Sequence, residues 1–164
     1  MKFDMHCHTK EGSIDAKVDL ENYVKKLVSL GYDGMLVTDH NSYRGHDQWE
    51  KLRTRLTAAA GRSFVVLRGI EYDTRDAGHM IVILPEREHT RMLEVRGLKG
   101  KQLIRRVHGL GGIIGPAHPY GNGFFALMNT RLGKKNESLM NSMDFVESFN
   151  ACVTPLQNRL AKRL

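Results

Sequence analysis

The sequence predicts an α/β fold built mostly from parallel strands. Short runs rich in β-branched residues alternate with stretches whose apolar residues recur with helical period, and glycines follow the first two of these stretches. The chain has 164 residues, of which 41% are hydrophobic, so it is long enough for one domain with a buried core. We therefore expect a single domain over residues 1–164, arranged as an α/β layer or barrel.

The first half of the chain contains three predicted strands separated by two helices. In order, these are a strand at Lys2–His6, a helix at Asp19–Leu30, a strand at Met35–Asp39, a helix from about Asp47 to Ala60, and a strand at Phe64–Glu71. Gly31 and Gly61 end the two helices, because glycine readily adopts the left-handed conformation that closes a helix. Helical connections of this length favour parallel pairing of the strands.

The next connection is different. Only residues 72–78 separate the third strand from the apolar run His79–Leu84, and this is too short for a helical crossover. These two strands are therefore predicted to be antiparallel, which would bring Glu71 and His79 to the same edge of the sheet.

The remaining segments complete the predicted pattern. They are a helix at Lys101–Leu110, a strand at Gly112–Pro116, a long irregular loop at 121–143, a strand at Asp144–Phe149, and a final helix at Pro155–Leu164.

The net charge of +7 is unevenly distributed along the chain. Residues 1–84 contain 12 Lys+Arg and 12 Asp+Glu, whereas residues 85–164 contain 13 and 6. A basic second half is compatible with binding to nucleic acid or a phosphorylated metabolite, and equally with a solvated basic surface.

The sequence also favours a soluble cytoplasmic protein without a membrane partner. The first residues are polar where a signal peptide would be apolar, and the longest apolar runs are too short to span a bilayer. Cys7 and Cys152 are expected to be free thiols, since two distant cysteines do not make a disulfide framework.

Two histidines near the start of the chain are spaced for metal binding. Side chains two residues apart on a strand share a face and lie about 6.6 Å apart along it, so His6 and His8 point the same way and Cys7 points away. Two neutral imidazoles can chelate Zn, Mn or Fe. A single His-X-His motif also occurs by chance on surface strands.

Further candidate ligands follow the other predicted strands. Ligands and catalytic groups gather at the carboxyl ends of strands in α/β folds. These candidates are Asp39 and His40 after the second strand, Glu71 at the end of the third, His79 on the short hairpin, and His118 after the fifth. The other three histidines, His46, His89 and His108, are expected to be solvated or structural.

Taken in chain order, the segments HCHT, GSIDA, TDH, GIE, GHMIVIL and GPAHP resemble the polymerase and histidinol phosphatase (PHP) family of metal-dependent phosphoesterases. The resemblance extends from His6 to about Asn150. It implies a distorted TIM-like α/β barrel whose rim holds two or three divalent ions, which would be Mn, Zn or Fe. By position, the implied ligands are His6, His8, Asp15, His40, Glu71, His79 and His118, with Glu71 bridging two ions.

Further candidate roles concern residues beside the implied ligands and the expected chemistry. Asp39 would orient a metal-bound imidazole. Asp15 could instead cap the helix that begins near Asp19. Either His118 or the histidine of a terminal Asp-X-His motif that family members usually have, and this sequence lacks, could transfer a proton. Arg44 and Arg131 could hold the phosphate, although surface arginines often have no such role.

The chain departs from the family pattern at its end. Family members usually supply two more ligands from an Asp-X-His motif after one further βα unit, and this sequence contains no such motif. We therefore expect a PHP domain truncated at its C-terminus and lacking its last βα unit, with a short variant as the alternative.

The predicted function is hydrolysis of a phosphate ester by attack of a metal-held hydroxide on phosphorus. The substrate would be a phosphorylated small molecule or a nucleotide. Two alternatives stay open: a non-catalytic module that binds nucleic acid or a phosphorylated ligand, and a metal hydrolase of the amidohydrolase type. A structural zinc site is less favoured, because such sites typically use cysteine.

Overall fold

The computed structural model describes residues 1–85, 91–135 and 137–164. Contacts within the chain divide it into two compact units, residues 1–70 and 71–164. Each unit is described by itself, and a single domain stays a prediction. His89, expected to be a solvated histidine, lies outside the described residues.

The first unit contains three parallel strands. They are β1 (Phe3–Cys7), β2 (Gly34–Val37) and β3 (Val65–Asp73), and β3 continues into the second unit. Phe3 pairs with Gly34, and Gly34 pairs with Val65 on its other side. The three strands lie within two residues of their predicted bounds, and the predicted parallel pairing is confirmed in this unit.

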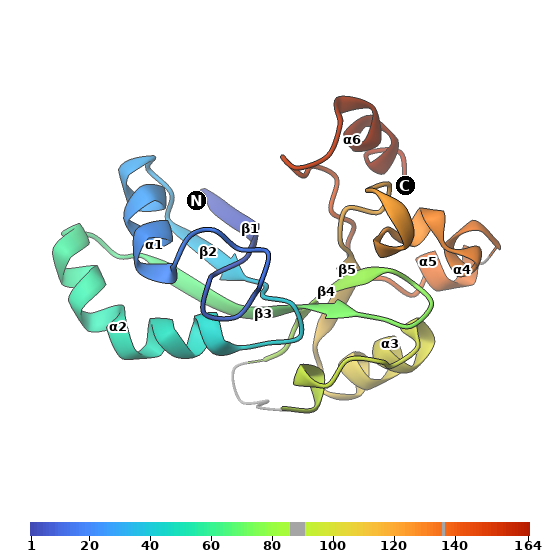
Figure 1. The fold of residues 1–164 in the computed structure, drawn as a ribbon, viewed down its shortest axis with the longest axis horizontal. Helices are drawn as coiled ribbons and strands as arrows, with labels where there is room; N and C mark the ends of the chain where they lie inside the picture. The colour runs from blue at the N-terminus through green and yellow to red at the C-terminus, as the bar shows by residue number, and fades with distance from the viewer. Residues whose placement is uncertain (86–90, 136) are drawn as a thin grey trace. The chain divides into compact units, whose positions relative to one another are not determined.

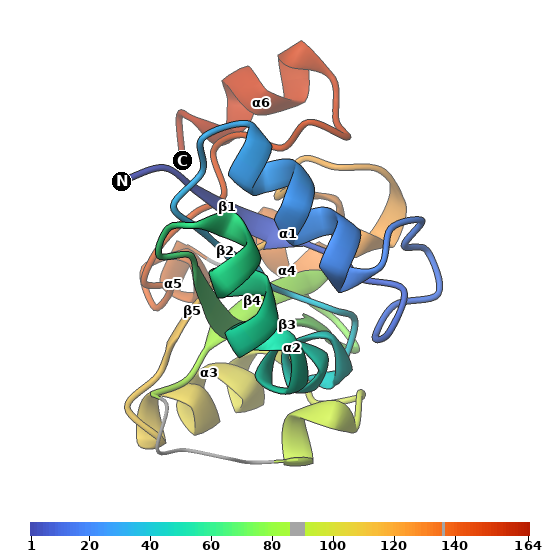
Figure 2. The same cartoon turned by 90° about the vertical axis from the view of Figure 1, so that its left-hand side faces the viewer.

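Two helices connect these strands, and they lie beside each other in both views (Figures 1 and 2). Helix α1 (Leu20–Ser29) begins where the side chain of Asp19 accepts a hydrogen bond of 2.9 Å from the backbone N–H of Asn22. Helix α2 (Arg44–Ala60) begins three residues before its predicted start and ends at Gly61, whose φ is +61°.

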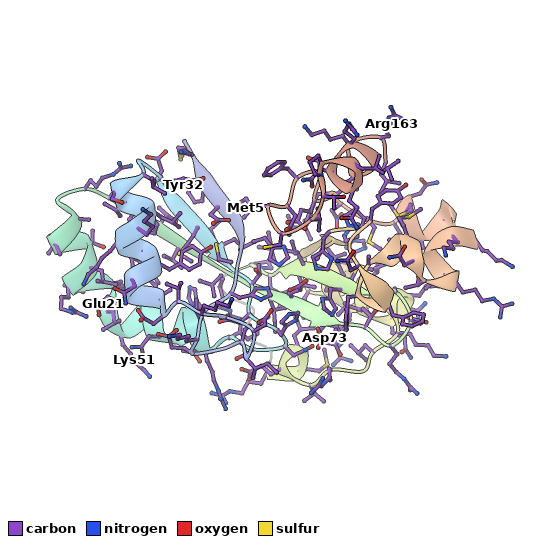
Figure 3. The ribbon with its side chains drawn as sticks, turned by 45° about the horizontal axis from the view of Figure 1, so that its top comes forward. Met5, Glu21, Tyr32, Lys51, Asp73 and Arg163 are labelled. Atoms are coloured by element: carbon purple, nitrogen blue, oxygen red, sulfur yellow. The ribbon has the colours of Figure 1, made fainter. Side chains whose placement is uncertain are left out.

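Apolar side chains from both helices and from the strands form the core of this unit. The core includes Leu20, Val24, Leu27, Met35, Val37, Trp49, Leu56, Phe64 and Val66. On the surface, Figure 3 labels Glu21 of α1, whose carboxylate accepts two hydrogen bonds from the guanidinium of Arg55 in α2. This pair joins the two helices outside the core.

The second unit begins within β3 and contains two further strands. Its elements are β4 (His79–Ile83), η1 (Arg91–Glu94), α3 (Gly100–Gly109), β5 (Ile113–Pro116), η2 (Gly123–Phe125), η3 (Leu127–Asn129), α4 (Arg131–Lys135), α5 (Glu137–Met140) and α6 (Pro155–Ala161). Buried Leu103, Ile104 and Val107 of α3 contribute to its core, and α3 packs against β5.

The expectation of mostly parallel strands is wrong for this unit. Strands β4 and β5 are antiparallel, with Ile83 opposite Ile113 and Met80 opposite Pro116. The segment between them leaves and returns at the same end of the pair, so its helix does not cross the sheet. A helical connection commonly joins parallel strands, whereas here it closes a long antiparallel hairpin.

The sheet is therefore mixed. The strand order is β1-β2-β3-β4-β5, so β1 and β5 are its edge strands among the described residues. These strands do not close into the barrel that the resemblance implied. Absence of the last βα unit stays a prediction.

Residues 144–149 do not form the predicted strand. The backbone N–H of Asp144 donates to the carbonyl of Ile114, as in a ladder. However, the carboxylate of Asp144 accepts from the N–H of Ile114, and that of Glu147 accepts from the N–H of His118. Side chains thus take the donors that a neighbouring strand would have used, and the ladder does not form.

The prediction of an irregular loop at 121–143 is also wrong, because this segment contains η2, η3, α4 and α5. Buried Leu127 and Leu139 anchor it. Residues 155–161 form the predicted final helix, begun by a hydrogen bond from Gln157 N–H to Thr154 Oγ1.

None of the described helices is long and apolar enough to cross a membrane. Both cysteines are free thiols, Cys7 buried and Cys152 exposed.

Candidate functional site

The first group of candidate ligands lies in the first unit, where β1 ends. His6 is in β1 and His8 follows it directly, and their Nε2 atoms are 3.1 Å apart. Cys7 between them is buried, with its thiol directed toward the carbonyl of Asp4. The predicted alternation is present: the two imidazoles face each other and the thiol points into the protein.

Asp15 and His40 complete this group. Nδ1 of His8 lies 3.1 Å from Oδ2 of Asp15, and Nε2 of His40 lies 3.5 Å from the same oxygen. The rings of His8 and His40 meet edge to face, with centroids 4.6 Å apart. One atom each from His8, Asp15 and His40 lie within 4.8 Å of one another. The helix that Asp15 could have capped uses Asp19 instead.

Asp39 is fully buried beside this group and holds the chain that follows β1. Its carboxylate accepts hydrogen bonds from the N–H of Thr9 at 2.6 Å, from the hydroxyl of Thr9 at 2.8 Å and from the N–H of Gly45 at 3.2 Å. Burial raises the pKa of this carboxyl, while the bonds from Thr9 oppose the rise. Because Thr9 follows His8, these bonds fix the backbone from which the imidazole projects.

The second group lies in the second unit and is built around Glu71. This residue is buried in β3, and its Oε1 atom lies 3.1 Å from Nδ1 of His79 and 3.0 Å from Nε2 of His118. His79 is the first residue of β4, and His118 follows β5. One carboxylate oxygen therefore meets two imidazole nitrogens from two other segments of the chain.

The backbone of His118 has an unusual conformation that presents its ring. Its φ of +28° lies in a region that non-glycine residues rarely adopt, and its N–H donates to the carboxylate of Glu147. A Cβ atom at Gly121 would lie 2.9 Å from Nδ1 of His118. The close approach of the chain to the ring therefore requires glycine at position 121.

Two carboxylates of this region were not predicted from the sequence. Oδ1 of Asp73 lies 3.3 Å from Nε2 of His79, on the side of the ring away from Glu71. The signal for Asp73 was available, because it is two residues after Glu71 and so shares its face of β3. Glu147, which holds His118, had no such signal, since it lies in the segment wrongly predicted as a strand.

The two candidate arginines are exposed. Arg44 is the first residue of α2 in the first unit, and Arg131 is the first residue of α4 in the second. Arg131 lines a pocket of about 340 Å³ together with Asp76, Leu132 and Lys135. His108, predicted to be outside the site, pairs with Asp144 at 2.9 Å.

Both groups have the donor atoms that suit a divalent metal ion. Imidazole nitrogens and carboxylate oxygens are the ligands of Zn, Mn and Fe sites, and Cys7 is directed away from the His6–His8 pair. In the first group two ring nitrogens approach to 3.1 Å, and in the second two approach one buried carboxylate oxygen. The imidazole nitrogens and carboxylate oxygens of these residues are therefore the kinds of ligand atom that a multi-metal site requires.

Comparison with solved structures supports the fold. The chain is similar to a candidate metal-dependent phosphoesterase from Bifidobacterium adolescentis, at 15% sequence identity and a TM-score of 0.68, over 99% of this chain and 82% of the other. It also matches Endonuclease Q bound to a 27-mer duplex with an abasic lesion, at 18% identity and a TM-score of 0.49, over 88% of this chain and 40% of the other. An amidohydrolase from Chromobacterium violaceum matches at 14% identity and a TM-score of 0.41, over 66% and 34%. At 15% identity, the similarity to the first of these proteins concerns the fold alone.

A comparison with the curated proteins gave no match. A comparison with family models gave a match: residues 4–148, which are most of the chain, match the model of the PHP domain. This range contains every candidate ligand of both groups, and we conclude that the chain belongs to the PHP domain family.

Proposed function

We propose that this chain is a metal-dependent phosphoesterase. The observation that carries the proposal is the buried Glu71 carboxylate, whose Oε1 atom meets both His79 and His118. A buried carboxylate is costly unless it is paired or bound to a cation, so this arrangement favours a cation site in a family of phosphoesterase type.

The proposed ligands come from both groups. They are His6, His8, Asp15, His40, Glu71, His79 and His118. Asp39 would act through Thr9, by fixing the backbone beside His8. Asp73 would hold the ring of His79 by accepting a hydrogen bond from Nε2–H, so that the unprotonated Nδ1, on the side of Glu71, would be the metal-binding atom.

Bound divalent ions would lower the pKa of water and neutralise charge that develops on the phosphoryl oxygens. The residues of the chain would then orient the substrate and move protons. His118 is the candidate for proton transfer, because its ring projects from a backbone fixed by Glu147 and Gly121. Arg44 and Arg131 are proposed to bind phosphate. Both residues are exposed to solvent, so a phosphate group could reach their guanidinium groups.

A panel of phosphomonoesters, phosphodiesters and amides, each assayed with Mn²⁺, Zn²⁺ or Fe²⁺ and with a chelator, tests this function. We expect hydrolysis of at least one phosphate ester that requires metal. Turnover of amides alone would favour the amidohydrolase alternative. Salt-sensitive nucleic-acid binding that persists in chelator, without turnover of any ester, would favour the non-catalytic module.

Elemental analysis of the purified protein provides a second, independent measurement. We expect a divalent metal that is retained through dialysis and is lost when Glu71 and His118 are replaced together. A protein that binds no metal at any concentration of Mn²⁺, Zn²⁺ or Fe²⁺ would contradict the proposal without any assumption about the substrate.

A further inference from the structure

The backbone of His118 is in a conformation that needs support from its surroundings. Its φ of +28° lies outside the regions that residues with a side chain favour. Such a conformation costs energy, and it persists only where neighbouring groups fix it. The N–H of His118 donates to Oε2 of Glu147, and its carbonyl accepts from the N–H of Gly121 at 2.6 Å. The backbone of this residue is therefore hydrogen-bonded at both ends.

The second oxygen of Glu147 extends this support along the chain. Its Oε1 atom accepts a hydrogen bond of 3.0 Å from the side-chain amide of Asn150. The side-chain oxygen of Asn150 accepts from the N–H of Cys152 at 2.8 Å, so the amide group cannot rotate without losing two bonds. The carboxylate of Glu147 is thus held at both oxygens, by His118 at one and by Asn150 at the other.

Asn158 of α6 in turn holds Asn150. The backbone N–H of Asn150 donates to Oδ1 of Asn158 at 2.9 Å, and its carbonyl accepts from Nδ2 of Asn158 at 3.0 Å. Asn158 is only 9% exposed, and these two bonds use both the oxygen and the nitrogen of its side chain. A buried amide without partners is costly, so this reciprocal pair fixes residue 150 against α6.

A separate contact joins α6 to the chain that follows His118. The side-chain amide of Gln157 donates to Oδ1 of Asn122 at 3.2 Å, and Asn122 is the residue after Gly121. Like the bonds of Asn158, this contact lies within the second unit. Helix α6 therefore contacts both segments that hold the backbone of His118.

We propose that Asn158 is a positioning residue for His118 and that it acts through Asn150 and Glu147. Nε2 of His118 lies 3.0 Å from Oε1 of Glu71, so the backbone that this network fixes presents the imidazole to the proposed cation site. The inference rests on the proposed function for the role of His118 as a ligand. It adds that α6, a distant segment of the chain, influences how tightly that ligand binds.

The first measurement uses the metal-free protein and requires no activity. Amide hydrogen exchange followed by ¹⁵N NMR reports how often the bond from the N–H of His118 opens. We expect exchange at His118 to accelerate at least about 10-fold in Glu147→Ala, the lower end of the effect of a hydrogen bond to a charged group. In Asn158→Ala we expect at least about 2-fold, because this residue acts through others. Amides in the middle of α3 are the internal reference for unfolding of the unit.

Three further variants isolate the network. Arg159→Ala, at the exposed position next to Asn158, is the matched control and should leave exchange at His118 unchanged. Asn158→Asp keeps the acceptor for the N–H of Asn150 and removes the donor, so it should cause a smaller acceleration than Asn158→Ala. In the double variant of Glu147→Ala with Asn158→Ala, exchange at His118 should equal that of Glu147→Ala alone, because the route from Asn158 is already broken.

Calorimetry with Mn²⁺ connects the network to the proposed cation site. Glu147→Ala should lower the affinity by about 10-fold or more, the usual effect of losing a group that orients a ligand. Asn158→Ala should lower it by at least about 2-fold. Arg159→Ala should bind Mn²⁺ as the parent does. Urea denaturation of each variant shows whether the fold is retained.

The positioning role and the proposed function fail in different ways. Exchange at His118 that is unchanged in Asn158→Ala, or that accelerates only as much as in α3, would overturn the positioning role. So would effects that add in the double variant, and so would Mn²⁺ affinity that does not respond to Asn158→Ala. If the parent protein binds no Mn²⁺ while exchange at His118 still depends on Asn158, the proposed function is wrong and the support of the His118 backbone by α6 stands.

Discussion

Nε2 of His118 lies 3.0 Å from Oε1 of Glu71, although the two residues are 47 positions apart in the chain. The contact exists because β3 delivers the carboxylate and the segment after β5 delivers the imidazole within one compact unit. It places a buried carboxylate beside two imidazoles, in surroundings where a charged group needs hydrogen bonds, an opposite charge or a bound cation to be stable.

Replacement of this carboxylate should strongly reduce the proposed metal-dependent activity. We expect Glu71→Gln to lower kcat by about 100- to 1,000-fold, which is the usual effect of losing one group that stabilises charge in the transition state. Metal content should fall as well, because an amide is a weaker ligand than a carboxylate. Glu50→Gln, at an exposed position of α2, is the control and should change neither quantity.

Asp73 should tune the affinity of the site through His79. Its Oδ1 atom is 3.3 Å from Nε2 of His79, so Asp73→Asn should lower the affinity for Mn²⁺ or Zn²⁺ by about 10- to 100-fold. Isothermal titration calorimetry measures the affinity, and ¹⁵N spectra of the histidine rings report which nitrogen carries the proton. Unchanged affinity together with an unchanged proton position on His79 would show that Asp73 has no such role.

The stability of the first unit should fall when a side chain is added at Gly45, near the start of α2. A Cβ atom at Gly45 would lie 2.3 Å from both Oδ2 of Asp39 and Oγ1 of Thr9, which are buried and hydrogen-bonded to each other. We expect Gly45→Ala to lower the free energy of unfolding by about 1–3 kcal/mol, the cost of overpacking a well-packed site. Gly109→Ala is the control, since nothing lies within 4 Å of its Cβ position. Urea denaturation distinguishes the two variants.

The two thiols should differ in reactivity. Cys7 is 1% exposed, and burial raises the pKa of its thiol well above the ordinary value of 9.0, so little reactive thiolate forms. Cys152 is exposed. A thiol reagent added to the native protein should modify one cysteine rapidly, and the second only after denaturation. Rapid modification of both in the native state would contradict the placement of Cys7.

The contribution of the Glu21–Arg55 pair, which joins α1 and α2, to the free energy of unfolding should depend on pH. Hydrogen bonds from Arg55, followed by that from Lys25, lower the pKa of Glu21 from 4.5 to about 2. A carboxyl whose pKa is lower in the folded state contributes stability above its unfolded pKa and loses that contribution as pH falls to the folded value. Glu21→Gln should therefore be less stable than the parent at pH 7, by a small amount because the pair is exposed, and the difference should vanish between about pH 4.5 and pH 2. A difference that persists at pH 2 would mean that the mutation acts through something other than this charge.

The local pattern of the sequence was sufficient to locate most elements. Period-two alternation at His6 and His8 predicted the facing imidazoles, and Gly31 and Gly61 marked the ends of α1 and α2. These features depend on neighbours within a few residues, so they are visible in the order of the amino acids. The same reasoning failed at residues 144–149, because the carboxylate of Asp144 accepts from Ile114 in β5 and that of Glu147 accepts from His118 just after it, about 30 residues away in the chain.

The sequence by itself determined the family, the residue types of the candidate ligands and the approximate positions of all five strands. Only the tertiary structure decided that β4 and β5 are antiparallel, that Asp73 and Glu147 hold His79 and His118, and that Phe125 lies against His79. The physical reason is range: helix period, strand alternation and caps arise between residues close in the chain. The direction of a long connection and the partners of a side chain depend on packing between segments far apart in it.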